Sequence, residues 1–143
     1  MRLREGRSAA DVGPVSRTSW ALPFAPATVR NARTLVTVAL RRHGVAQQVV
    51  DDARIVVSEL LGNALRHARP IPNEGLVMSL EVGDDAVRVA VADGGSATVP
   101  ALLHAPDLAL SGRGLRIVRT LTREWGVRED DRGNTVFAVL ALG

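Results

Sequence analysis

The hydrophobic positions between residues 46 and 68 recur every three to four residues, which predicts one long buried helix. On a helix with about 100° per residue, six apolar side chains form an unbroken stripe that faces a core. These are Ala53, Val57, Leu60, Leu61, Ala64 and Ala68. Pro70 predicts the end of the helix, because a proline disfavours the helical conformation of the residue before it.

A carboxylate and a carboxamide, Glu59 and Asn63, lie one helical turn apart on another face of this helix, with Asp52 and His67 beside them. An amide oxygen can hold a metal ion while a neighbouring carboxylate polarises a water or a hydroxyl. The alternative is a solvated polar face, since polar pairs at this spacing are common on helices. Spacing alone leaves both interpretations open.

The rest of the chain predicts strands in hairpins and further helices. Weak alternation over residues 20–24 predicts an edge strand, because Pro23 cannot donate to a central ladder. A helical period runs from Pro26 to Gly44, and another restarts at Leu115. Alternation of period two predicts strands over residues 76–82 and 87–93, around Trp125 and Val127, and over residues 135–142, the last apolar on both faces and therefore central.

This order predicts an α+β fold, a two-layer sandwich of one mixed, mostly antiparallel sheet with helices on one face. Residues 1–18 have no apolar period and carry four arginines, so we expect a flexible tail before a single domain over residues 19–143.

Asp93 follows Val87, Val89 and Val91 on one face of its strand, so the alternation aims its carboxylate toward the interior. A buried carboxylate needs a hydrogen-bond donor. Asp93 either caps the Gly94–Gly95 turn or accepts a hydrogen bond from an amino group of a ligand.

Residues 94–111 lack a period, and loops of this length in a small domain are usually lids or binding loops. The loop ends in Ser111, Gly112, Arg113 and Gly114, directly before a helical stripe. Backbone N–H groups at such a helix start can bind phosphate, although a lone G-x-G is a weak signal.

Composition excludes several classes. The 143 residues contain no cysteine, so disulfides and thiolate metal sites are absent. No apolar run is long enough to span a membrane or to form a signal peptide, so we expect a cytoplasmic protein. The net charge is only +3 and aromatics make up 3%, which argues against direct binding to nucleic acid.

Three motifs now stand in order: E-x-x-x-N at Glu59 and Asn63, D-x-G at Asp93 and Gly95, and G-x-G-L from Gly112 to Leu115. Together they resemble the N, G1 and G2 boxes of the GHKL ATP-binding superfamily. The stretches VVSELLGNALRHA and GRGLRIVRTLTREWGV look like those of the small anti-sigma-factor serine/threonine kinases of actinobacteria. The similarity extends from about residue 20 to the end.

The resemblance implies a role for each motif residue. Asn63 matches the ligand of the Mg²⁺ ion that bridges the ATP phosphates, and Glu59 matches the candidate general base. Asp93 matches the acceptor for the adenine amino group, and Gly95 lets the chain pass close to the base. The other ATP-binding positions implied are Gly112, Arg113, Gly114 and Leu115 at the lid hinge and Thr135 near adenine.

Two positions depart from the family pattern. Ala97 stands where the fuller G1 motif has a second glycine, and Asn134 stands where relatives often carry a basic residue. His67 could be mistaken for a phosphoacceptor, but it lies on the nucleotide helix and is expected to be structural.

The resemblance implies a serine/threonine protein kinase that uses ATP and Mg²⁺, acts on an anti-anti-sigma protein with a STAS fold, and forms a homodimer through its first strand and helix. The alternative is a nucleotide-dependent module that sequesters a sigma factor or another regulator without phosphotransfer. A third interpretation, the ATPase subunit of a larger machine or a detached histidine-kinase domain, is less favoured, because the chain length argues against the machines, which need transducer domains.

Overall fold

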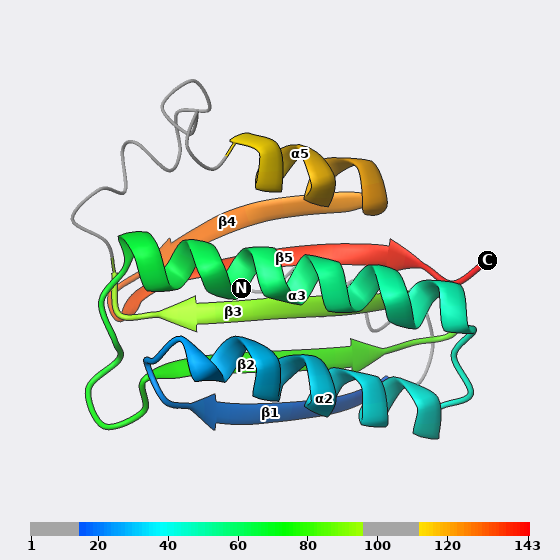
Figure 1. Ribbon diagram of the computed structural model, residues 1–143, viewed down its shortest axis with the longest axis horizontal. Coiled ribbons are helices and arrows are strands. Elements are labelled where there is room, and N and C mark those ends of the chain that lie inside the picture. The colour runs from blue at the N-terminus through cyan, green and yellow to red at the C-terminus, as the bar shows by residue number, and fades with distance from the viewer. Residues whose placement is uncertain (1–14, 96–111) are drawn as a thin grey trace.

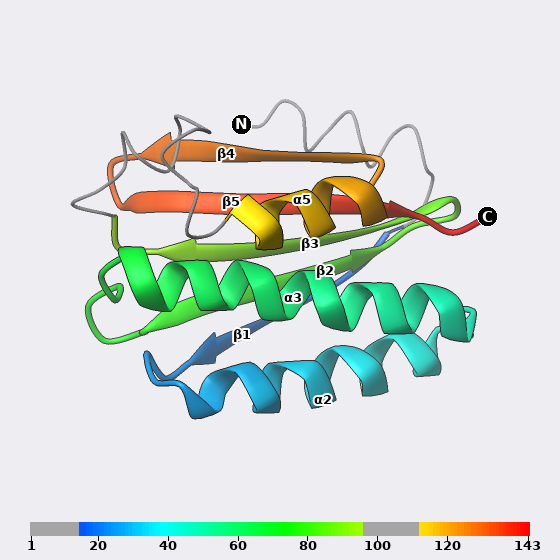
Figure 2. The ribbon, with the colours of Figure 1, turned by 45° about the horizontal axis from the view of Figure 1, so that its top comes forward.

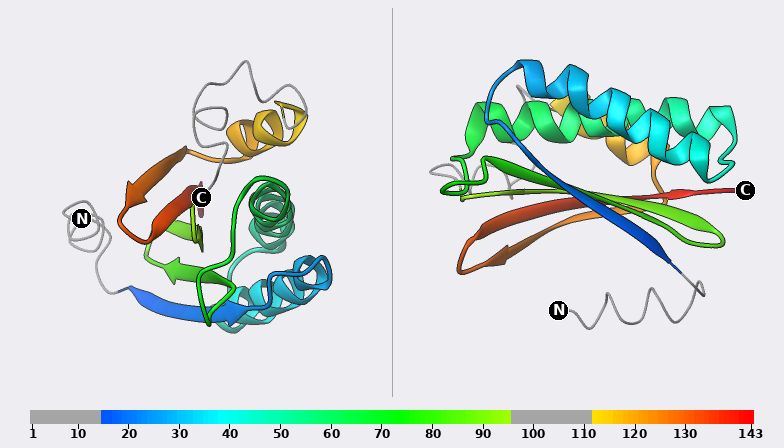
Figure 3. Two further views of the ribbon diagram at one scale, coloured as in Figure 1. Left: turned by 90° about the vertical axis from the view of Figure 1, so that its left-hand side faces the viewer. Right: turned by 90° about the horizontal axis from the view of Figure 1, so that it is seen from below.

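The computed structural model describes residues 15–95 and 112–143 and has two layers, a twisted sheet and a layer of helices on one of its faces (Figures 1 and 3). The sheet has five strands in the order β1-β2-β3-β5-β4, and every neighbouring pair is antiparallel. This confirms the predicted α+β sandwich and sharpens it, since the described sheet contains no parallel pair.

The elements follow the predicted order. Along the chain they are β1 (Ser16–Leu22), α2 (Ala27–Arg42), α3 (Gln47–His67), β2 (Leu76–Val82), β3 (Ala86–Asp93), α5 (Gly112–Leu121), β4 (Glu124–Asp130) and β5 (Gly133–Ala141). Figure 2 shows α3 in the middle of the helical layer, with α2 on one side and α5 on the other.

The long helix α3 packs across the sheet by its apolar stripe. Val56, Val57, Leu60 and Leu61 are at most 1% exposed. From the sheet, alternate positions of β2 and β3 meet this stripe: Leu76, Met78, Leu80, Val87, Val89 and Val91. Burial of these side chains fixes the rotation of α3 about its axis, because a different rotation would expose several of them to water.

The helix ends follow local sequence signals. Helix α2 ends where Gly44 adopts a left-handed conformation with φ of 71°. Helix α3 ends at His67, and Ala68 is already extended, ahead of Pro70. Both ends agree with the boundaries predicted from the sequence.

The first strand differs from its prediction. It begins at Ser16 and ends at Leu22, whereas the sequence predicts residues 20–24. Its full length pairs with β2, which extends the strand toward the N-terminus, and Pro23 ends it. Residues 16–18, assigned to the tail, therefore belong to the sheet, while residues 1–14 lie outside the described residues. The position of β1 at the sheet edge is as predicted.

In the described part of the chain, every helix is too short or too polar to cross a lipid bilayer.

Candidate functional site

Glu59 and Asn63 lie on the flank of α3, between the buried stripe and solvent. Asn63 is 9% exposed and Glu59 is half-buried, and both belong to the second half of a helix whose rotation the core fixes. The two side chains project from the same flank because they are four residues apart. The structure therefore brings this predicted pair together.

Asn63 already contacts a positively charged group. Its Oδ1 accepts a hydrogen bond from Nη2 of Arg66 at 3.0 Å. Arg66 is exposed and follows three residues later on the same helix, so its guanidinium can leave without disturbing the core. The sequence prediction did not include Arg66, although the three-residue spacing on a helix could have suggested it.

Asp93 is the last residue of β3, and its side chain is buried, with 4% exposed. Its Oδ1 accepts a hydrogen bond from the backbone N–H of Gly95 at 2.8 Å. The interpretation of Asp93 as the cap of the Gly94–Gly95 turn is thus confirmed. A contact with a ligand stays a prediction.

Burial raises the pKa of Asp93 above its usual 3.8, and the backbone N–H groups of Gly95 and Asn134 act in the opposite direction by stabilising the carboxylate. A raised pKa at a buried carboxyl group is typical of positions that bind ligands, although buried structural carboxyls share it.

Two backbone hydrogen bonds join the segment that follows α3 to the turn that follows Asp93. The N–H of Arg69 donates to the carbonyl of Gly95, and the N–H of Gly94 donates to the carbonyl of Arg69, each at 2.7 Å. Gly94 is needed at this crossing, because a Cβ there would lie 2.3 Å from the carbonyl oxygen of Pro70. The helix of Asn63 and the strand of Asp93 are therefore held in a fixed relation at this edge.

The register between β3 and β5 adds one residue to the predicted site. Asp93 pairs with Asn134, and Ala92 pairs with Thr135. Paired residues share a face of the sheet and neighbouring residues alternate, so Thr135 lies on the face opposite Asp93. Asn134, which is 5% exposed, is the residue beside Asp93 and joins Thr135 as an adenine-side candidate, because Asp93, Asn134 and Thr135 all line one pocket of about 270 Å³.

The glycine-rich segment lies in the first turn of α5, which contains the backbone of Gly112, Arg113, Gly114 and Leu115. Helix α5 runs alongside α3 in both views of the helical layer (Figures 1 and 2). The G-x-G segment and the Glu59–Asn63 helix are therefore neighbours. Of the predicted loop over residues 94–111, residues 96–111, including Ala97, lie outside the described residues, and so do the side chains of residues 112–115.

His67 is the last residue of α3 and is half-buried. Residues 15–95 and 112–143 contain no cluster of three or more histidine and acidic side chains that could hold a metal ion by themselves. A metal ion at Asn63 would need most of its ligands from a bound molecule.

Comparisons with known proteins agree with this geometry. A family model described as a histidine kinase-like ATPase domain matches residues 22–140. No curated protein sequence matches the chain.

Solved structures share the fold. The chain is similar to the RsbU and RsbW domains of Rv1364c from Mycobacterium tuberculosis, with a TM-score of 0.63, 20% identity, and coverage of 90% of this chain but 32% of that one. It is also similar to a chain of the SiaB–SiaC complex from Pseudomonas aeruginosa, with a TM-score of 0.58 and 10% identity. This match covers 97% of the present chain and 95% of the other one. The chain thus spans about a third of the length of the first of these structures.

Proposed function

The chain belongs to the histidine kinase-like ATPase family, and we propose that it is an ATP-dependent serine/threonine kinase for a STAS-type anti-anti-sigma protein. The observation that carries the proposal is the position of Glu59, a half-buried carboxylate one helical turn from Asn63. A module that only binds nucleotide has no need of a carboxylate there.

The described residues supply contacts at both ends of a nucleotide. Asp93 and Asn134, buried side by side at the end of the sheet, suit the polar edge of adenine. Asn63 and the first turn of α5 suit the phosphates, because amide oxygens bind cations and helix N-termini bind anions.

The side-chain oxygen of Asn63 suits a Mg²⁺ ion, because it faces a position that a cation can occupy. In this structure the Oδ1 accepts a hydrogen bond from the guanidinium of Arg66, which is positively charged. Mg²⁺ commonly takes one or two protein oxygens and completes its shell with phosphates and waters. The ion, when bound at Asn63, would neutralise charge on the phosphates.

Glu59 would act as general base. Its carboxylate accepts the proton of the substrate hydroxyl while the hydroxyl oxygen forms a bond to the γ-phosphorus of ATP. The bond between that phosphorus and the β–γ bridging oxygen breaks, and ADP leaves with the electron pair. Orientation and charge stabilisation supply most of the rate enhancement, and the base adds a factor of about 10²–10⁴.

Phosphotransfer from γ-labelled ATP tests the proposal. The protein is incubated with Mg²⁺ and candidate STAS-domain proteins, and Glu59→Gln is run in parallel. We expect label on a serine or threonine of one candidate, and a loss of about 10²–10⁴-fold in the variant with unchanged ATP affinity. Equal transfer by wild type and Glu59→Gln would remove Glu59 from the mechanism.

The alternative function is a nucleotide-dependent binding module that sequesters a sigma factor or another regulator. Asn134 leaves room for it, because this residue stands where relatives in the resembled family often carry a basic side chain. Nucleotide affinity that is the same with and without Mg²⁺, together with absent phosphotransfer, would support this function over the kinase.

Two further parts of the proposal concern setting and assembly. As a kinase of transcription regulators the protein would act in the cytoplasm. Homodimerisation through β1 and α2 is supported by the position of β1 at the sheet edge, where one row of backbone groups is open to pairing.

A further inference from the structure

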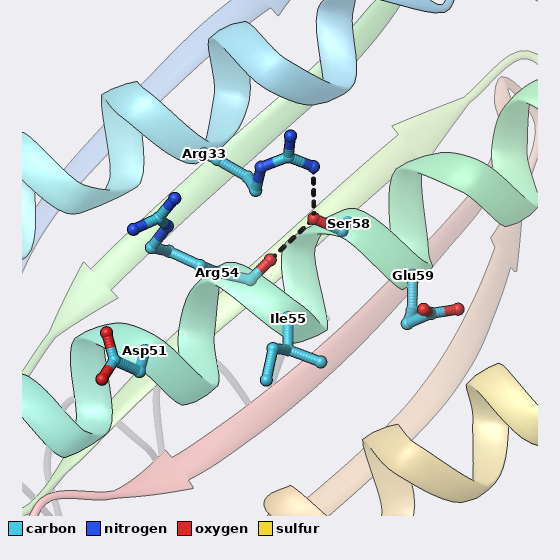
Figure 4. Close-up of a pocket in the computed structure, with 6 residues that line it drawn as sticks. All are labelled: Arg33, Asp51, Arg54, Ile55, Ser58 and Glu59. Atoms are coloured by element: carbon cyan, nitrogen blue, oxygen red, sulfur yellow. Dashed lines mark hydrogen bonds between the residues drawn. The ribbon is translucent and has the colours of Figure 1, made fainter.

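A shallow groove of about 380 Å³ lies on the outer surface of the helical layer, where α2 and α3 run side by side, and Glu59 lines it. The other lining residues are Arg33 from α2 and Asp51, Arg54, Ile55 and Ser58 from α3. In Figure 4, Arg33 and Arg54 lie on the α2 side of α3, and Ile55 and Glu59 lie on the side of α5. The groove therefore adjoins the proposed catalytic carboxylate.

The polar wall of the groove is held by internal hydrogen bonds. Nη1 of Arg33 donates to Oγ of Ser58 at 3.1 Å, and this hydroxyl donates to the backbone carbonyl of Arg54 at 2.8 Å (Figure 4). These bonds connect α2 to α3 and orient the Arg33 guanidinium along the groove. The positive charge has a defined position before any partner binds.

Ile55 gives the groove an exposed apolar side chain. It is 42% exposed, and in the part of the chain that the structure describes only Val38 is another large apolar residue of comparable exposure, at 44%. Ile55 precedes Glu59 by four residues, so the two side chains are neighbours about 6 Å apart along the helix. A group that reaches Glu59 from solvent meets Ile55 beside it.

The groove itself is lined by two arginines and two carboxylates, and the positive surplus comes from the surrounding surface of α2. Helix α2 carries Arg30, Arg33, Arg41 and Arg42 and no acidic residue, and Arg54 adds an exposed guanidinium from α3. None of the ion pairs between residues that the structure describes includes any of these five arginines. Of the two carboxylates in the groove, Asp51 accepts a hydrogen bond from Nε2 of Gln47 at 2.8 Å, and Glu59 is the proposed base.

We propose that this groove docks the protein substrate, through a segment in which the acceptor hydroxyl is flanked by an apolar side chain and by carboxylates. The apolar side chain covers Ile55, the carboxylates pair with Arg33 and Arg54, and the hydroxyl then lies over Glu59. This inference rests on the proposed kinase function. It specifies which residues of the substrate flank the acceptor hydroxyl, namely acidic and apolar ones.

Serine peptides of defined composition and matched variants test the docking surface. The first probe is a library of peptides with a central serine, in which each pool fixes one residue type at one flanking position. We expect wild-type protein to prefer aspartate or glutamate together with leucine or isoleucine. Arg54→Glu should reverse the preference from acidic to basic residues, because it inverts the charge at one wall.

The second measurement compares Ile55→Asp with Val38→Asp, the same change at an exposed apolar residue outside the groove. Ile55→Asp should raise KM for the best peptide about tenfold or more, and Val38→Asp should leave it unchanged. ATP affinity and the unfolding temperature should stay at wild-type values in both, which excludes misfolding as the cause.

The failures of the two proposals are distinguishable. Two results would contradict the docking proposal without affecting the proposed kinase function. One is phosphotransfer to peptides with no preference for acidic residues, and the other is an equal KM for Ile55→Asp and Val38→Asp. A wild-type protein that binds ATP but labels neither peptides nor STAS-domain proteins overturns the kinase function and the docking inference with it.

Discussion

At the scale of single residues, the environment of Asp93 decides what this end of the sheet can bind. The carboxylate is buried and already accepts one backbone hydrogen bond, and a buried carboxamide lies next to it on β5. A carboxamide can donate and accept at once, so this pair can match both the amino group and a ring nitrogen of adenine.

We predict that Asn134→Ala weakens ATP binding about tenfold, the usual size of one lost hydrogen bond to a ligand. Thr135→Ala is the matched control, because it removes a polar side chain one residue away on the opposite face of the sheet. It should change the affinity less than about twofold. Calorimetric titration with ATP measures both, and the reverse ranking would favour Thr135 over Asn134 as the adenine-side residue.

The raised pKa of Asp93 predicts a pH dependence of stability. The folded state keeps the proton at pH values where the unfolded chain, with its usual pKa near 3.8, has released it. The free energy of unfolding therefore falls as the pH rises through that window, by at most about 1.4 kcal/mol per pH unit.

Urea unfolding of wild type and Asp93→Asn across mildly acidic pH isolates this contribution, since the other titrating groups are common to both proteins. The difference in unfolding free energy should shift in favour of Asp93→Asn as the pH rises. A difference independent of pH would mean that the Asp93 carboxyl group titrates alike in both states.

At the scale of elements, α3 contributes to the site twice. Its flank carries Glu59 and Asn63, and the segment after it crosses the turn that follows β3, where the Arg69–Gly95 and Gly94–Arg69 hydrogen bonds form. The turn has no room for a side chain at two positions. A Cβ on Gly94 would lie 2.3 Å from the carbonyl oxygen of Pro70, and a Cβ on Gly133, at the start of β5, would lie 2.0 Å from the carbonyl oxygen of Asp93. Close backbone contacts thus join helix, turn and strand.

Gly94→Ala should destabilise the protein by about 1–3 kcal/mol, because the new methyl group would overlap Pro70 and force the two segments apart. It should also weaken ATP binding, since the crossing sets the position of Asp93 relative to α3. Thermal unfolding and nucleotide titration measure the two effects.

Gly62→Ala provides the control for stability. Its added Cβ would lie 3.4 Å from the Arg66 guanidinium, an ordinary contact, and alanine favours a helix over glycine by about 0.5–1 kcal/mol. This variant should be as stable as wild type or more so. A Gly94→Ala protein as stable as Gly62→Ala would contradict the close crossing.

At the scale of the whole molecule, the layered arrangement presents two neighbouring surfaces. The nucleotide candidates gather where α3, α5 and the ends of β3 and β5 meet. The proposed docking groove lies on the outer surface between α2 and α3, and Glu59 belongs to both. Glu59 lies where the two surfaces adjoin, so the same carboxylate is within reach of both.

Much of this architecture was predictable from sequence, for a local physical reason. Helical and strand periods reflect which side chains must leave water, so the boundaries of α2 and α3 and the inward direction of Asp93 could be derived before the structure. The Glu59–Asn63 pair followed from the helical repeat alone. Strand β1 was predicted too short because its exposed half has no apolar pattern and forms only by pairing with β2.

The sequence by itself determined the two-layer fold, the pairing of Glu59 with Asn63, and the face on which Asp93 lies, because each depends on the period of one element. Only the tertiary structure decided the register of β5 against β3, which places Asn134 beside Asp93, and the approach of Arg66 to Asn63. It alone also placed Arg33 of α2 against Ser58 of α3. Register and contacts between elements depend on residues distant in the chain, and a local hydrophobic pattern carries no information about them.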